Sequence, residues 1–191
     1  MQEPKKERIT GTGAIPDEEL SLNDFFGIVY EELIHIASFV RKNESHQTIN
    51  STALVHEAWL KLRNSPPFVA KSLAQFKAIA ANAMRQVLVD EARRRGARKR
   101  GGSGEAIFVP LDDAVLAAAA SSDEDLLVLD ADLKELERLN PRQAQVVVDR
   151  FFGGMSVAEA AEVLGVSESA VERDSRVARA WLASKARSGG E

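Results

Sequence analysis

The chain has 191 residues and no cysteine, so disulfides, thiolate metal sites and cysteine nucleophiles are excluded. Its 45% hydrophobic and 28% charged content is ordinary for a soluble protein that buries a core, as one domain or two small ones. The net charge of −4 is unevenly spread: residues 71–102 hold nine Lys/Arg against two acids, whereas residues 103–140 hold ten acids against two Lys/Arg. Such asymmetry suggests a basic nucleic-acid-binding surface beside an acidic connector.

The first residues carry no signal for secretion or membrane insertion. Residues 1–8 are polar and charged, without the apolar stretch of a secretory signal. No run of about 18 apolar residues follows that could span a membrane. We therefore expect a cytoplasmic protein that begins with a polar arm over residues 1–20.

Three helices are predicted in the first half of the chain, because apolar residues recur there at three- and four-residue steps. They cover about residues 21–40, 52–63 and 72–95, and no segment shows the strict alternation of a β-strand. Pro66 and Pro67 lie just beyond the second helix and prevent it from continuing, since proline has no amide hydrogen and clashes with the preceding turn. The apolar faces of the three helices can share one core.

The third predicted helix ends in a run of positive charge. Six of the eight residues from 93 to 100 are Lys or Arg. Such a run attracts phosphate by counterion release and has no sequence preference of its own. The plainer interpretation is a flexible basic tail. Nucleic-acid contact is favoured because the run completes a well-patterned helix.

Residues 101–125 have the composition of a linker, with Gly-Gly-Ser-Gly at the start and a cluster of acids at the end. A second helical domain is expected from about Leu126. Within it, Asn140-Pro141 marks a helix start, because Asn is a good cap and proline loses nothing at the first helical position.

The stretch from residue 155 to 182 has the signature of a helix-turn-helix. Ser156 and Glu159 have the spacing of a capping box, which predicts a short first helix. Gly165 can supply the left-handed backbone of a sharp turn, and Ser167 can cap the second helix. Two helices joined by about three residues with a glycine are typical of this motif.

The second helix of the motif is predicted to read the major groove of DNA with its exposed N-terminal part. Arg173 is the best candidate for a base contact, because a guanidinium matches the edge of guanine. Ser169 and Glu172 are further base-contact candidates, and Arg176 and Arg179 are candidates for phosphate contacts. The capping residue Ser167 completes the predicted DNA-binding set of this helix. The plainer interpretation is a helical hairpin with solvated arginines.

The fold class predicted from these patterns is all-α, with two small helical domains joined by a flexible acidic linker. The predicted organisation is a polar arm (1–20), a first helical domain (21–100), a linker (101–125), a helix-turn-helix domain (126–187) and a tail (188–191).

No catalytic or metal-binding constellation is evident. The three histidines, at positions 35, 46 and 56, are too scattered to predict a site, and the position four residues after His56 is a leucine. The Gly-Gly-Ser-Gly segment lacks the Lys-Ser/Thr of a phosphate-binding loop. We therefore expect no enzyme activity, no metal, no cofactor and no small-molecule substrate.

Several stretches taken together resemble the extracytoplasmic-function (ECF) group of the sigma-seventy family of sigma factors. They include Thr52-Ala-Leu-Val-His-Glu-Ala-Trp-Leu60, Leu88-Val-Asp-Glu-Ala-Arg-Arg-Arg95, Asn140-Pro-Arg-Gln143 and Arg150-Phe-Phe-Gly-Gly-Met-Ser-Val157. The resemblance covers about residues 20–187. It implies a sigma factor that directs core RNA polymerase to promoter DNA, with an anti-sigma protein as a further potential partner.

The resemblance also implies roles for particular residues. The first domain, called region two in the family, would dock on the polymerase through Leu54, His56, Glu57, Leu60 and Lys61. The third helix would open the minus-ten element with Asn82, Arg85, Gln86, Arg93, Arg94 and Arg95. The second domain, region four, would read the minus-thirty-five element.

Two other functions stay open at the level of sequence. The first is a stand-alone helix-turn-helix regulator that acts without polymerase, although neither a dimer seam nor a sensor domain is evident. The second is a protein that only titrates polymerase, because Glu172 and Ser175 depart from the pattern of the resembling branch. Co-purification with core polymerase and a promoter-dependent transcript separate the three hypotheses.

Overall fold

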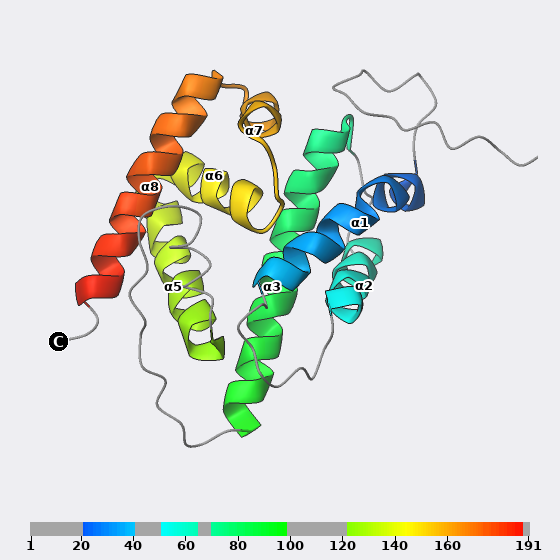
Figure 1. Ribbon diagram of the computed structural model, residues 1–191, viewed down its shortest axis with the longest axis horizontal. Helices are drawn as coiled ribbons and strands as arrows, with labels where there is room; N and C mark the ends of the chain where they lie inside the picture. Colours follow the sequence, from blue (N-terminus) through cyan, green and yellow to red (C-terminus); the bar gives the residue numbers. More distant parts are fainter. Residues whose placement is uncertain (1–20, 41–50, 65–69, 99–121, 189–191) are drawn as a thin grey trace, which may run out of the picture.

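The computed structural model describes residues 21–40, 51–64, 70–98 and 122–188 (Figure 1). These residues form helices and no strand, as the all-α prediction requires. The helices are α1 (Leu22–Val40), α2 (Ser51–Arg63), α3 (Leu73–Arg98), α5 (Asp123–Leu139), α6 (Pro141–Phe151), α7 (Val157–Leu164) and α8 (Glu168–Ser188). The predicted polar arm and most of the predicted linker lie outside the described residues.

The acidic end of the predicted linker belongs to a helix, which corrects the boundary at residue 125. Ser122 caps α5, because its hydroxyl accepts a hydrogen bond of 3.1 Å from the amide of Asp125. Three acids therefore occupy the first turn of α5, at residues 123–125. Negative charge is favourable there, since the backbone amides at a helix N-terminus carry partial positive charge.

Asn140 joins α5 to α6 without acting as a side-chain cap. Its backbone amide donates to the carbonyl of Leu136 at 2.7 Å, which closes α5, and its side chain makes no capping hydrogen bond to α6. The prediction that the Asn140 side chain caps α6 is therefore wrong. The predicted helix start is confirmed, because Pro141 occupies the first helical position of α6.

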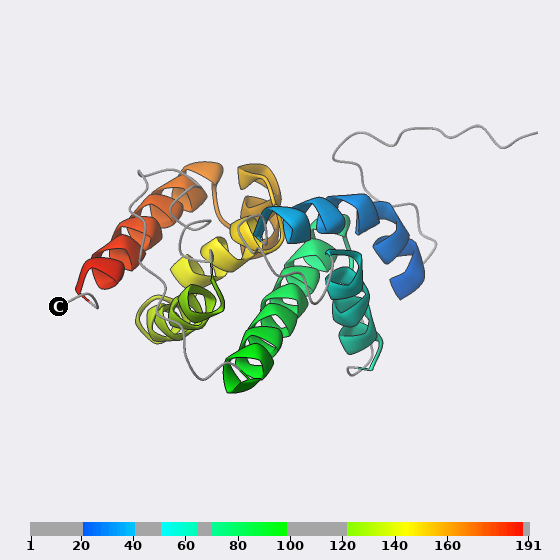
Figure 2. The same cartoon turned by 60° about the horizontal axis from the view of Figure 1, so that its bottom comes forward.

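The long helix α3 lies in the middle of the molecule and is covered on two sides (Figures 1 and 2). On one side it packs against α1 and α2, where the rings of Phe25 and Phe76 stack at 5.5 Å. On the other side it contacts α5, α6 and α7. One hydrophobic cluster contains buried residues of α1, α2, α3, α5, α6 and α8, so both predicted domains contribute to a common core.

No described helix is long and apolar enough to cross a membrane.

Candidate nucleic-acid interface

The helix-turn-helix forms as the sequence predicts. The hydroxyl of Ser156 accepts from the amide of Glu159 at 3.2 Å, and the Glu159 carboxylate accepts from the amide of Ser156 at 2.7 Å. Gly165 has φ 63° and ψ 37°, the left-handed conformation that a side chain would strain. The hydroxyl of Ser167 accepts from the amide of Ala170 at 3.3 Å and so caps α8.

The first turns of α8 present the predicted reading residues to solvent. Ser169, Glu172, Arg173 and Arg176 are all exposed. Ser167 is exposed as well, and its hydroxyl lies 3.1 Å from that of Ser169. These five residues therefore have the accessibility that contact with DNA requires.

Arg179 differs from the other candidates on α8. It is half-buried, and its Nε donates to the carbonyl of Ser175 at 3.2 Å within the same helix. At least one of its donors is therefore used in a hydrogen bond within α8.

An ion pair that the sequence analysis missed holds α8 against α6. Arg142 Nε donates to Asp174 Oδ2 at 2.6 Å, and the Asp174 side chain is almost fully buried. Hydrogen bonding and the charge of Asp174 raise the pKa of Arg142. Asp174 directly follows the exposed Arg173, so this pair, together with the buried Val171, Ala178 and Leu182, holds α8 with Arg173 facing solvent.

The candidate residues on α3 fall into two groups. Gln86, Arg93 and Arg94 are exposed, with 54% and 55% of the two arginine side chains accessible. Arg85 and Arg95 are only 12% and 13% exposed. The exposed residues are accessible to a nucleic acid, whereas Arg85 and Arg95 are covered by α5.

Acids of α5 hold the covered arginines. Arg85 donates from Nη2 to Asp130 Oδ1 at 2.8 Å and from Nε to the same oxygen at 3.0 Å. Arg95 Nη2 lies 2.8 Å from Asp123 Oδ1. Burial raises the pKa of Asp130, but the hydrogen bonds and charges of Lys134 and Arg85 outweigh it, so the pKa lies below 3.8.

Asn82, the last candidate on α3, is half-buried. Its side-chain nitrogen donates to the carbonyl of Ala78 at 3.0 Å. The structure therefore shows it bonded to its own helix, one turn back.

Four of the five predicted polymerase contacts lie on the accessible side of α2. His56 and Leu60 are exposed, and Glu57 and Lys61 are half-buried. Leu54 is a correction: its side chain has no exposed surface and belongs to the core, so it supports the helix and cannot reach a partner.

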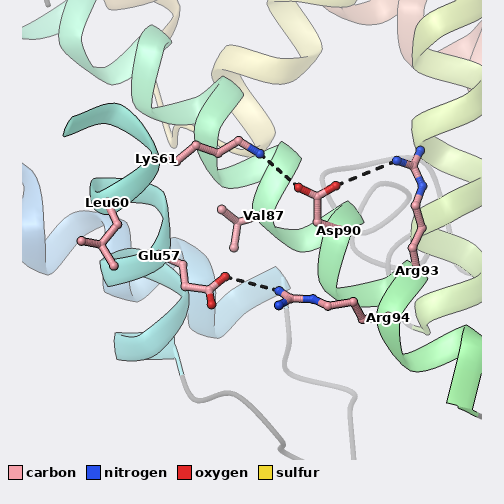
Figure 3. A pocket seen from close by; sticks show the side chains of 7 residues that line it. All are labelled: Glu57, Leu60, Lys61, Val87, Asp90, Arg93 and Arg94. Atoms are coloured by element: carbon pink, nitrogen blue, oxygen red, sulfur yellow. Dashed lines mark hydrogen bonds and ion pairs between the residues drawn. The ribbon is translucent and has the colours of Figure 1, made fainter. Parts of the chain in front are cut away.

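A cleft of about 550 Å³ opens between α2 and α3, as Figure 3 shows. Two ion pairs span it: Lys61 Nζ lies 3.0 Å from Asp90 Oδ2, and Arg94 Nη2 lies 3.4 Å from Glu57 Oε2. Glu57, Leu60 and Lys61 thus share one surface with Arg93 and Arg94 of the basic run, whereas His56 lies on the side of α2 that faces α1, with its Nε2 3.1 Å from the Tyr30 hydroxyl. The sequence predicted that the residues that share this surface lie on two separate helices, but it gave no signal that the two helices pair their charged side chains.

No group of three or more metal-ligating side chains occurs in the part of the chain that the structure describes.

Residues 17–188 match the model of the family described as ECF sigma factor. No curated protein and no solved structure matches the chain.

Proposed function

The chain belongs to the ECF sigma factor family, and we propose on this premise which of its surfaces meet the promoter and the polymerase. As a member, it directs core RNA polymerase to specific promoters and is not an enzyme. The match spans both halves of the chain and not the helix-turn-helix alone. This extent decides for a sigma factor over a stand-alone regulator.

We propose that α8 reads the upstream, minus-thirty-five element. The observation that carries this assignment is the exposed row of polar side chains on α8 opposite the buried Val171. Arg173 would contact base edges, with Ser169 and Glu172 beside it. Arg176 would contact phosphate, which positions the helix without selecting a sequence.

We propose that the cleft between α2 and α3 is where the first half meets the polymerase. His56, Glu57, Leu60 and Lys61 would supply the contacts from α2. The exposed Gln86, Arg93 and Arg94 on α3 would meet the minus-ten element, where flipping out a base costs a few kcal/mol. Arg85, Arg95 and Asn82 could join them only after leaving their present partners.

The test of the reading face is transcription by reconstituted holoenzyme from promoters randomised in the upstream element. Arg173→Ala should cost about 1–3 kcal/mol at the preferred element and relax the choice at one base position. Arg176→Ala, the matched control on the same exposed face, should weaken transcription from all sequences alike. Neither variant should change the affinity for core polymerase.

Two results would contradict this assignment. If Arg173→Ala lowered output without changing the preferred sequence, Arg173 would be a phosphate contact, and Ser169 and Glu172 would be the next candidates. If the wild-type chain bound core polymerase but supported no promoter-dependent transcript, the chain would be a titrating protein.

Two finer expectations follow from the family. We propose that the chain acts in the cytoplasm, because its partners there are RNA polymerase and DNA. An anti-sigma protein as an additional partner stays a prediction of the family resemblance, and co-purification of the intact chain from its own cells tests it.

A further inference from the structure

The apolar contacts of α8 fall into two separate hydrophobic clusters. Near the start of the helix, Val171 packs with Val146 of α6 and with alanines of α7. Further along, Ala178 and Leu182 belong to the main core. Because the hydrophobic effect is non-directional, these contacts hold α8 against its neighbours but set its rotation about its own axis only loosely.

Polar side chains occupy the buried positions of α8 between the two clusters. Asp174 and Ser175 are only 3% and 6% exposed. Asp174 Oδ2 accepts from Arg142 Nε of α6 at 2.6 Å. A hydrogen bond between two charged groups is stronger and geometrically more demanding than an apolar contact. The middle of α8 is therefore positioned by a directional contact with α6.

Arg142 extends from a well-anchored helix. It lies in the first turn of α6, directly after Pro141 at the first helical position. The rest of α6 lies against α8 (Figure 1) and is deeply buried, with Val146, Val147 and Phe151 in the protein interior. The helix α6 therefore provides a fixed reference, from which the long Arg142 side chain reaches Asp174.

The position of Asp174 determines that of Arg173, which directly precedes it and is exposed. Both side chains leave the same helix, so a rotation of α8 about its axis moves them by the same angle. A rotation of about 20° moves a group at the outer edge of a helix, about 6 Å from the axis, by about 2 Å. A functional contact tolerates a displacement of only about 0.5 Å. A contact between Arg173 and one particular base thus depends on what holds Asp174.

We propose that Arg142 and Asp174 are positioning residues that determine promoter specificity, although neither is assigned to the DNA interface. By holding α8 in one orientation on α6, they decide which base Arg173 reaches. A buried ion pair adds little net stability compared with apolar residues of similar size, because both charges lose their water. The contribution of this pair is the orientation that it selects. The inference rests on the reading role proposed above for Arg173.

Three variants of the pair separate orientation from stability. In the double variant Arg142→Met with Asp174→Leu, apolar side chains of comparable size replace both charges, so stability is kept while the directional contact is lost. Arg142→Ala leaves the buried Asp174 without its partner, and Arg142→Lys restores a positive charge at the same position. Ser156→Ala is the control, because it removes the cap of α7 in the same helix-turn-helix and leaves the pair in place.

Base choice is measured by transcription with reconstituted holoenzyme from promoters randomised in the upstream element, and stability by urea unfolding of each full chain. The double variant should unfold near the urea concentration of the unaltered chain. Its discrimination at the base that Arg173 reads should nevertheless fall about fivefold, the lower end of what an arginine–base contact contributes. Arg142→Ala should lose the same discrimination, and Arg142→Lys should recover part of it. Ser156→Ala should unfold at lower urea but keep the preferred sequence.

Three results would overturn the positioning role. Unchanged base choice in the double variant and in Arg142→Ala would show that the pair only supports the fold. An equal loss of transcription from all sequences in Arg142→Ala would identify Arg142 as a phosphate contact. The same relaxed choice in Ser156→Ala would attribute the change to lost stability.

Two further comparisons complete the test. Circular dichroism identifies a double variant that fails to fold, and Arg142→Ala with its lysine rescue then decides. Unchanged base choice in Arg173→Ala would overturn the reading role of Arg173 and this inference with it. Changed choice in Arg173→Ala together with unchanged choice in the variants of the pair would overturn this inference alone.

Discussion

Replacing Asp149 with Asn should stabilise this protein at neutral pH and leave its stability unchanged in acid. Asp149 lies on α6 with no exposed surface. Its Oδ1 accepts from Gln145 Nε2 at 2.7 Å, but its Oδ2 has no hydrogen-bond partner among the residues that the structure describes. Burial raises the pKa of Asp149 from 3.8 to about 6, an effect that the Gln145 hydrogen bond offsets only in part.

The direction of the pH effect follows from this raised pKa. Between 3.8 and about 6 the folded protein holds a proton that the unfolded chain has released. Stability therefore falls as the pH rises through this window and stays at the lower level above it. A rise of the pKa from 3.8 to about 6 corresponds to about 3 kcal/mol, which is the upper limit of the loss in the free energy of unfolding. The side chain of the Asp149→Asn variant is neutral at every pH, so this variant does not undergo the loss of stability.

Urea unfolding from about pH 4 to about pH 7.5 measures the difference in the free energy of unfolding between the two proteins. The difference should be near zero at the acidic end, grow through the window and level off above about pH 6. Glu162→Gln, which removes an exposed carboxylate from α7, controls for the change in net charge. A gain of equal size at both ends would show that the gain does not come from the ionisation of Asp149. A loss at neutral pH would show that contacts other than Gln145 stabilise the Asp149 carboxylate.

Three further substitutions test how the helix-turn-helix is held. Arg142→Ala should lower the free energy of unfolding in urea, because the buried Asp174 loses its partner; Arg142→Lys should recover part of the lost stability. Ser156→Ala should cost about 1 kcal/mol in urea unfolding through the lost capping box, and equal stability would mean that water replaces the cap. Gly165→Ala should cost about 1–2 kcal/mol in thermal unfolding from backbone strain alone, since no other described residue lies within 4 Å of the added methyl group; Gly165→Asn should cost less.

Local sequence signals predicted the helix-turn-helix closely. The capping box at Ser156, the left-handed Gly165 and the cap at Ser167 each depend on contacts within about four residues. Such contacts are specified by spacing, because the backbone of one helical turn brings the partners together wherever the helix lies in the fold. For the same reason the exposed face of α8, with Arg173 on it, was predictable from its periodicity.

The second buried face of α3 had no comparable signal. Alanines at positions 74, 78 and 81 are buried there. Alanine is common in helices whether it is buried or exposed, because it loses no side-chain entropy. The periodicity of the larger residues, such as Phe76, therefore indicated one core face, and the contact with the C-terminal half was missed.

The partners of the charged residues were decided by tertiary structure alone. Arg85 and Arg94 lie on the same helix, yet one is covered by Asp130 from 45 residues away and the other is largely exposed. Sequence determined that this chain is all-α, ends in a helix-turn-helix and carries a basic helix. The way in which the two halves dock decides which basic side chains stay accessible to a partner. Sequence does not predict this docking, because it brings together residues whose separation along the chain follows no periodic pattern.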